Sequence, residues 1–196
     1  DLGFCWIGLG SEGRMEQTLA TDQDNAIIFA DEPPGGVPAA RDRLLAFATE
    51  VNDILAECGF PLCLGGIMAR NPMWCLTLAE WRERFDDWMR NANPKALLNA
   101  AIFFDLRPLY GDEELALELQ EFLVASVPKR PAFLRQMAVN ALEVRPPGGF
   151  FSDIPLGQEA GGLMDLKLHA SRPIVDCARI LTLAAGITLT STTERL

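Results

Sequence analysis

The sequence predicts an α/β (α+β) protein in which a small mixed sheet comes first and an all-helical domain follows. Two short apolar runs, 4–7 and 26–29, flank a glycine-containing turn near the start of the chain and are typical of strands. After Gly111 every segment with a regular apolar pattern has helical spacing. We therefore expect an α/β domain over residues 1–111 and a C-terminal helical domain over residues 112–196.

The N-terminal elements follow from apolar runs and from the residues that break them. The run Phe4-Cys5-Trp6-Ile7 predicts a strand, Gly8-Leu9-Gly10-Ser11 a turn, and the residues after it a short helix. Asp22-Gln23-Asp24 then leads into the second strand, 26–29. Three prolines and two glycines in 31–38 predict a surface loop.

The remaining elements are mostly helices whose apolar residues recur every three or four positions. The expected helices are 39–58, the segment from Leu78 to Trp88 with Thr77 as N-cap, 113–124, 130–142, and 164–185 with a kink or break near Pro173. A short strand is expected within 61–68, a buried strand over 100–109, and a linker at 145–149.

Composition limits the classes of function. The chain has 196 residues, of which 49% are hydrophobic, and no apolar run approaches the ~18 residues of a membrane span. Its formal net charge of −10 disfavours extended nucleic acid as a partner, whereas a nucleotide that arrives with a divalent cation is compatible with it. We expect a cytoplasmic protein. Because it has no initiator Met and enters a strand almost at once, we also expect it to be a piece of a longer protein.

Asp22 and Asp24 are the first candidate functional residues. Residues two apart on a strand point to the same face with Cα atoms ~6.6 Å apart, so both carboxylates can converge on shared cations. Without a cation, two carboxylates ~4 Å apart repel by about 4 kcal/mol at an effective dielectric near 20. Oxygen ligands, with no His or Cys close in sequence, favour Mg²⁺ or Mn²⁺ over zinc. The alternative is a solvated turn or a helix cap.

The turn before these acids predicts a phosphate site. Gly10 and Ser11 precede a helix, where free backbone N–H groups can receive phosphate oxygens. The Ser11 hydroxyl adds a donor, and Arg14 could reach the same phosphates. Gly8, Gly10 and Gly13 also match a dinucleotide-binding fingerprint, but only about two turns of helix fit before Asp22, so an NAD-dependent oxidoreductase is the weaker alternative.

Asp105 is the third candidate acid. An ionisable group within Ile102-Phe103-Phe104 and Leu106 must be paired or bind metal, because burying it alone is costly. One interpretation is an ion pair with Arg107. The other makes Asp105 the third metal ligand and the general base that deprotonates an attacking hydroxyl.

These residues resemble the DNA polymerase β-like nucleotidyltransferase superfamily, which has Gly-Ser, about ten residues, Asp-x-Asp and a later third carboxylate. The segments 10–14 and 21–25 more closely resemble the nucleotidyltransferase family attached to CBS and cyclic-nucleotide-binding modules in bacterial signalling proteins. That family is similar to the protein-PII uridylyltransferases. The segments 69–74, 103–107 and 165–169 fit it too, so the resemblance covers nearly the whole chain.

The resemblance implies roles for particular residues. Gly10 and Ser11 would hold the triphosphate, while Asp22, Asp24 and Asp105 would complete a site for two Mg²⁺ ions. The helical segment that holds Lys167 and Arg172 would close over the cleft with either residue near the nucleotide; a solvated helix face is the alternative. Gln23 and Asn25 depart from the superfamily, which has apolar residues there, so we expect the back of that strand to be less well buried.

The sequence thus predicts a magnesium-dependent nucleotidyltransferase. It would move a nucleoside monophosphate from a nucleoside triphosphate such as ATP to an acceptor hydroxyl, which could lie on a protein. The resemblance implies an output domain of a signalling protein, with a homodimer formed through regions outside this sequence. The alternative is a catalytically silent, nucleotide-sensing regulatory module.

Overall fold

A mixed four-stranded sheet forms the centre of the molecule, as the sequence predicted. The computed structural model describes residues 2–19, 21–31, 33, 35–143 and 166–196. The strands are β1 (Phe4–Gly8), β2 (Asn25–Phe29), β3 (Cys75–Thr77) and β4 (Arg107–Gly111). Their order is β3-β2-β1-β4; β1 is antiparallel to β2 and β4, whereas β2 and β3 are parallel.

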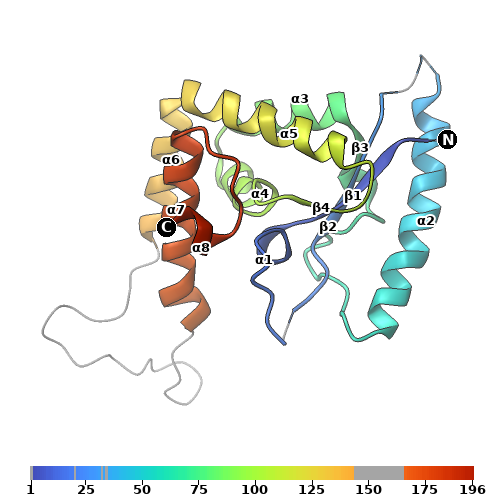
Figure 1. Ribbon diagram of the computed structural model, residues 1–196, viewed down its shortest axis with the longest axis horizontal. Helices are drawn as coiled ribbons and strands as arrows, with labels where there is room; N and C mark the ends of the chain where they lie inside the picture. The colour runs from blue at the N-terminus through green and yellow to red at the C-terminus, as the bar shows by residue number, and fades with distance from the viewer. Residues whose placement is uncertain (1, 20, 32, 34, 144–165) are drawn as a thin grey trace, which may run out of the picture.

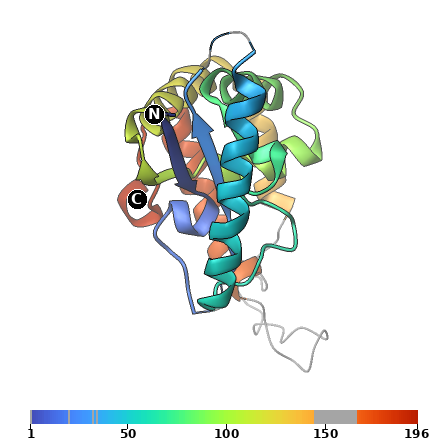
Figure 2. The ribbon, with the colours of Figure 1, turned by 90° about the vertical axis from the view of Figure 1, so that its right-hand side faces the viewer.

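Helices cover both faces of this sheet (Figures 1 and 2). The α-helices are α1 (Gly10–Gly13), α2 (Val37–Glu57), α3 (Leu78–Arg90), α4 (Pro94–Phe103), α5 (Glu113–Ser126), α6 (Pro131–Glu143), α7 (Arg172–Ala184) and α8 (Thr192–Arg195). Shorter helical turns are η1 (Pro72–Trp74), η2 (Val127–Lys129) and η3 (Lys167–Ser171), the last a π-helix. No helix in these described ranges is long and apolar enough to cross a membrane.

Because successive side chains of a strand point to opposite faces of the sheet, the core consists of two clusters. Ile7 and Ile28 point to the larger cluster, which contains residues of α3 to α7. Trp6 and Ile27 point to the opposite face, where α2 packs. Because the larger cluster contains residues from both sides of residue 111, one core connects the two expected domains. Their division at residue 111 stays a prediction.

The expected buried strand over 100–109 is wrong. Its first half belongs to helix α4, and only its end enters β4. Asn93 caps α4 by accepting a hydrogen bond from the Ala96 amide, and Pro94 occupies the first turn, where it needs no N–H donor. A continuous apolar run fits a buried helix or a buried strand equally well. Here, the local start signals decide for the helix.

The segment 61–68 was also assigned wrongly, because it contributes only a single bridge between Leu62 and Gln23. The third strand is β3, which the sequence analysis missed because it is three residues long. Helix α3 was predicted correctly, including its cap: Thr77 and Glu80 form a reciprocal capping box. At the C-terminal end, the π-turns of η3 give way to α7 next to Pro173, consistent with the predicted break. The predicted linker at 145–149 lies outside the described residues.

Candidate active site

The acidic pair lies where the chain enters β2. Asp22 is exposed and Asp24 is half-buried. These two acids form a group with Cys63. One potential ligand atom of each of the three side chains lies within 4.8 Å of those of the other two. The Leu9 amide donates to the carbonyl of Asp24 at 3.0 Å, which joins the glycine turn to the pair. The structure therefore brings the two predicted acids together and sets them beside the turn.

The environment of Asp24 favours a cation. Burial raises the pKa of its carboxyl group, and the charge of Asp22 adds to that increase, whereas a hydrogen bond from Cys63 and the charge of Lys167 oppose it. A divalent cation between the acids would replace this repulsion with attraction.

Cys63 is a neighbour that the sequence analysis did not anticipate, since it assumed that no cysteine lay near the acids. The bridge between Leu62 and Gln23 brings its loop to the start of β2. Burial raises the pKa of the Cys63 thiol to about 11, and the thiol donates a hydrogen bond to Asp24. Without a metal the thiol is therefore a protonated donor to Asp24. The two carboxylates of Asp22 and Asp24 suit a hard cation such as Mg²⁺ or Mn²⁺.

Gly10 lets the turn approach these acids closely. Its φ is +53°, in the left-handed region, and a Cβ atom added there would lie 3.6 Å from Asp24 Oδ2. Gly10 and Ser11 begin helix α1, so their N–H groups have no partner within the helix. These donors lie next to the carboxylates, as a site for a metal-bound phosphate would require.

The back of the acidic strand is well buried, contrary to expectation. Gln23 and Asn25 are 3% and 2% exposed. The amide nitrogen of Asn52 in α2 donates to the side-chain oxygens of both, at 2.7 and 3.1 Å, and Gln23 donates to the backbone carbonyl of Asn52 at 2.9 Å. This network fixes the backbone segment that carries Asp22 and Asp24.

Asp105 does not join the acidic pair, and its assignment as third metal ligand and general base is corrected here. Its side chain is fully buried. Arg14 contacts Oδ2 at 2.8 Å, Arg179 contacts Oδ2 at 2.6 Å, and Arg195 contacts Oδ1 at 2.8 Å. Burial alone would raise the pKa of Asp105, but the arginines outweigh it and hold the pKa below its usual value. The alternative prediction, that Asp105 forms an ion pair, is confirmed, but the predicted partner Arg107 is wrong. Arg107 instead donates to the backbone carbonyl of Glu12.

The same cluster removes Arg14 from the expected phosphate site. Its guanidinium group also contacts Glu16 at 2.8 Å, and Glu16 in turn accepts the Thr192 amide at 2.7 Å. Arg179 contacts Asp176 at 2.5 Å. The ion cluster therefore connects the residues that follow α1 to α7 and α8, and we refer to it as the arginine cluster (Arg14, Glu16, Asp105, Asp176, Arg179 and Arg195).

Lys167 and Arg172 occupy different environments. Lys167, the first residue of η3, is exposed, and its charge acts on Asp24, so it lies on the side of the acidic pair that faces the C-terminal helices. Arg172 contacts Asp176 at 3.6 Å with its side chain 40% exposed. Of the two, Lys167 is the better candidate for a nucleotide contact.

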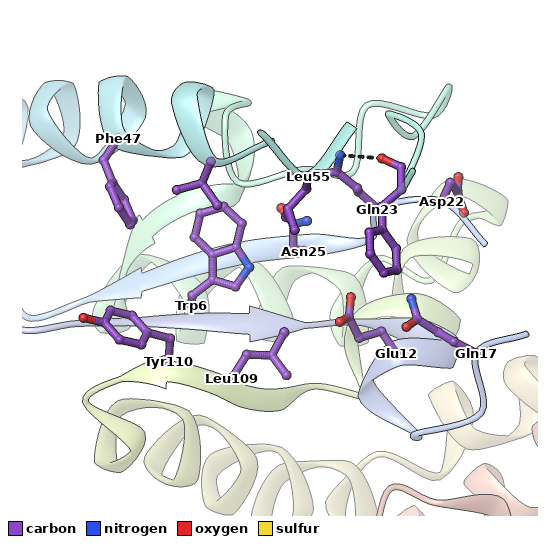
Figure 3. Close-up of a pocket in the computed structure, with 12 residues that line it drawn as sticks. Trp6, Glu12, Gln17, Asp22, Gln23, Asn25, Phe47, Leu55, Leu109 and Tyr110 are labelled. Atoms are coloured by element: carbon purple, nitrogen blue, oxygen red, sulfur yellow. Dashed lines mark hydrogen bonds between the residues drawn. The ribbon is translucent and has the colours of Figure 1, made fainter. Parts of the chain in front are cut away.

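A cleft of about 300 Å³ opens on the other side of the acids, between α2 and the strands β1 and β4 (Figure 3). Its walls are mainly aromatic and aliphatic, and Glu12, Gln17 and Asp22 lie at one end. Since Asp22 also belongs to the acidic pair, the cleft leads directly to the candidate metal site.

Two family models match parts of this chain, and both are described as nucleotidyltransferase domains. Residues 1–95 match the family model described as "Putative nucleotidyltransferase DUF294". Residues 131–196 match a second model, "Putative nucleotidyltransferase substrate binding domain". Each match covers less than half of the chain, and both support a likeness to nucleotidyltransferases over the residues that they cover. Searches of the curated proteins and of the solved structures find no significant match.

Sequence reasoning missed Glu12 and Cys63 in this site. The sequence position of Glu12 could have indicated it, since it lies between Ser11 and Gly13 in the turn. No sequence pattern indicates Cys63, because only the folding of the chain brings its loop to β2.

Proposed function

We propose that this chain is a nucleotidyltransferase that uses Mg²⁺ or Mn²⁺ to move a nucleoside monophosphate from a nucleoside triphosphate to an acceptor hydroxyl. The observation that carries the proposal is the position of Asp24 directly against Gly10, in a group with Asp22. Acidic side chains beside amides that have no partner within the helix suit a metal-bound phosphate group.

In this proposal each residue has a distinct task. Asp22 and Asp24 hold the metal, while the amides of Gly10 and Ser11 orient the triphosphate. Lys167 approaches the phosphates from the C-terminal helices. A bound divalent cation would supply the positive charge that stabilises the attacking and leaving oxygens. The acceptor oxygen attacks the α-phosphorus, and pyrophosphate leaves.

The resemblance supports two finer proposals, namely an acceptor on a protein and a role as the output domain of a bacterial signalling protein. A catalytically silent nucleotide sensor is the second candidate function. The engagement of Asp105 with three arginines favours it, because the expected third carboxylate does not reach the acidic pair.

The experiment measures pyrophosphate release and transfer of the α-phosphorus label from each nucleoside triphosphate, with and without Mg²⁺. We expect Asp22→Asn and Asp24→Asn to lower the rate by ~100-fold or more, since each removes a metal ligand. Asp42→Asn on the exposed side of α2 is the matched control and should retain full activity. Full activity in Asp24→Asn would refute the proposal. Tight binding of nucleotide without turnover would favour the sensor.

A further inference from the structure

The residues that follow helix α1 fix the turn to which the proposed function assigns the triphosphate. The Arg14 amide donates to the carbonyl of Gly10 at 3.0 Å. The Glu16 amide donates to the carbonyl of Ser11 at 2.8 Å. Because the carbonyl of Gly10 and the N–H group of Ser11 belong to one planar peptide unit, the bond from Arg14 also sets the direction of the Ser11 N–H group.

Met15, which lies between these two donors, has a backbone conformation that few non-glycine residues adopt. Its φ is +59°, in the left-handed region, and the residue is 62% exposed. Such a conformation is strained, and it is kept only where the surrounding contacts determine it. Since Met15 is mostly exposed, those contacts must come from the residues on either side of it.

The Glu16 carboxylate makes two such contacts. Its Oε2 atom accepts a hydrogen bond from Nε of Arg14 at 2.8 Å, which connects the side chains on the two sides of Met15. Its Oε1 atom accepts a hydrogen bond from the backbone N–H of Thr192 at 2.7 Å. Thr192 is the first residue of α8 and lies 176 residues further along the chain. We refer to Arg14, Glu16 and Thr192 as the Glu16 bridge.

Charge strengthens the contact between Glu16 and Thr192. Burial raises the pKa of Glu16, but the hydrogen bonds from Arg14 and Thr192 outweigh it and hold the pKa below its usual value, so the acceptor is a carboxylate at neutral pH. A hydrogen bond to an ionised acceptor is roughly twice as strong as one between neutral groups. Thr192 is only 8% exposed, so little water competes for its amide.

The Glu16 bridge joins two parts of the chain that match different family models. Glu16 lies within residues 1–95 and Thr192 within residues 131–196. Arg195 of α8 reaches Arg14 only through Asp105, which both arginines contact. The bond between Thr192 and Glu16 has no such intermediate. It is therefore the direct connection from α8 to the residues that fix the turn.

We propose that Glu16 is a positioning residue for the triphosphate, and that α8, through the Thr192 amide, holds the turn in the conformation that binds phosphate. This inference rests on the proposed function for the assignment of the turn to the triphosphate. With the bridge intact, Met15 keeps its left-handed conformation, and the amides of Gly10 and Ser11 keep their direction. Without it Met15 relaxes, the backbone bonds to the turn loosen, and nucleotide affinity falls.

The acidic pair does not depend on this bridge. Asp22 and Asp24 lie on the segment that Asn52 fixes through Gln23 and Asn25. Loss of the bridge should therefore weaken nucleotide binding and leave the chemical step nearly unchanged. Loss of a metal ligand, in contrast, lowers kcat.

Thr192→Pro tests the bridge by removing one N–H group. Proline suits the first residue of a helix, and Ser191 before it has φ −61° and ψ 131°, the conformation that a residue before proline prefers. Thr192→Val is the conservative variant, because it keeps the N–H group and loses a buried hydroxyl that has no hydrogen-bond partner among the described residues. Glu16→Ala deletes the acceptor instead. Its matched control is Glu121→Ala, at an exposed position of α5.

Calorimetry measures the Kd of non-hydrolysable nucleoside triphosphates with Mg²⁺, and label transfer from the hydrolysable nucleotides gives KM and kcat. Circular dichroism identifies a temperature at which every variant is folded. We expect Thr192→Pro and Glu16→Ala to raise the Kd and the KM for nucleotide by about tenfold, with kcat within about threefold of wild type. Thr192→Val and Glu121→Ala should keep the wild-type Kd.

A second-site change separates positioning from a general loss of stability. Met15→Gly permits the left-handed conformation without strain, so the turn no longer needs the bridge to keep it. In the double variant of Thr192→Pro and Met15→Gly we expect the Kd for nucleotide to return to within about threefold of wild type. A variant that bound weakly only because it was less stable would not be repaired at a temperature at which it is already folded.

Different failures separate the two proposals. If wild type transfers label in an Asp24-dependent manner but folded Thr192→Pro and Glu16→Ala bind nucleotide as wild type does, the positioning role is overturned and the proposed function stands. Equal weakening in Thr192→Val, or no repair by Met15→Gly, also overturns the positioning role. If wild type binds nucleotide, Thr192→Pro weakens that binding, and no nucleotide is consumed, the transferase is overturned and the positioning role stands. If wild type binds no nucleotide, both are overturned.

Discussion

Replacing Asp105 with asparagine is the sharpest perturbation that the fold offers. The side chains of Asp105, Arg179 and Arg195 are at most 2% exposed, and that of Arg14 is 12% exposed. In the arginine cluster three arginines face three carboxylates, so Asp105→Asn leaves one positive charge without a counterpart. Removing one partner from a buried ion pair costs about 3–5 kcal/mol of unfolding free energy.

Thermal and urea unfolding measure this cost directly. In a chain of this size each kcal/mol corresponds to roughly 2–4 °C in Tm, so we expect Asp105→Asn to lower Tm by about 6–20 °C. Asp53→Asn is the matched control, because Asp53 pairs with Arg70 at 2.5 Å on the surface with its side chain 55% exposed. Asp53→Asn should lower the free energy of unfolding by at most ~1 kcal/mol. A cost below ~1 kcal/mol for Asp105→Asn would refute the reasoning.

Three further predictions test the frame around the site. Gly13→Ala should prevent stable folding, because the added methyl would overlap the backbone carbonyl of Asp105; a wild-type circular dichroism melt would contradict this. Asn52→Leu should cost about 2–4 kcal/mol in urea unfolding, since Gln23 and its neighbours lose buried partners, and an unchanged midpoint would contradict it. Mg²⁺ affinity measured by calorimetry should fall as pH falls through the raised pKa of Asp24, because protons compete with the metal; a flat profile from pH 4 to 8 would contradict it.

The arginine cluster also gives stability a defined dependence on pH. The pKa of Asp105 is lower in the folded than in the unfolded chain, because the attraction of the arginines exceeds the effect of burial. Its contribution is therefore complete above the unfolded value of about 4 and is lost as pH falls through the lower folded value. Wild type should lose stability in that acidic range, whereas Asp105→Asn should lose less.

Local patterns were sufficient to predict which residues meet at the acidic pair. Glycine and serine in a tight turn, and two aspartates before an apolar strand, are encoded within about fifteen residues, and the structure brings them together. The short helix expected after the turn is wrong, because α1 is formed by Gly10–Gly13 of the turn itself and the residues from 14 to 19 are not helical. The fold class and most helices followed from periodicity in the same way. The Thr77 N-cap of α3 was also predicted, because the cap and the helix that it begins are adjacent in sequence.

The errors arose where distant residues decide the outcome. The run around Asp105 fits a helix or a strand, and its arginine partners lie 91 and 74 residues away in Arg14 and Arg179. No local pattern reveals that three arginines converge there. The burial of Gln23 likewise depends on Asn52, 29 residues away. Such contacts exist only after α2 and the C-terminal helices have packed.

In the proposed function Asp22 and Asp24, and not Asp105, hold the metal. Electron paramagnetic resonance of Mn²⁺ titrated into the protein with a non-hydrolysable nucleoside triphosphate tests it most directly, at a temperature where every variant is folded. We expect Asp24→Asn to abolish protein-dependent Mn²⁺ binding, whereas Asp105→Asn and Asp42→Asn should leave it unchanged. Retained binding in Asp24→Asn together with lost binding in Asp105→Asn would contradict it.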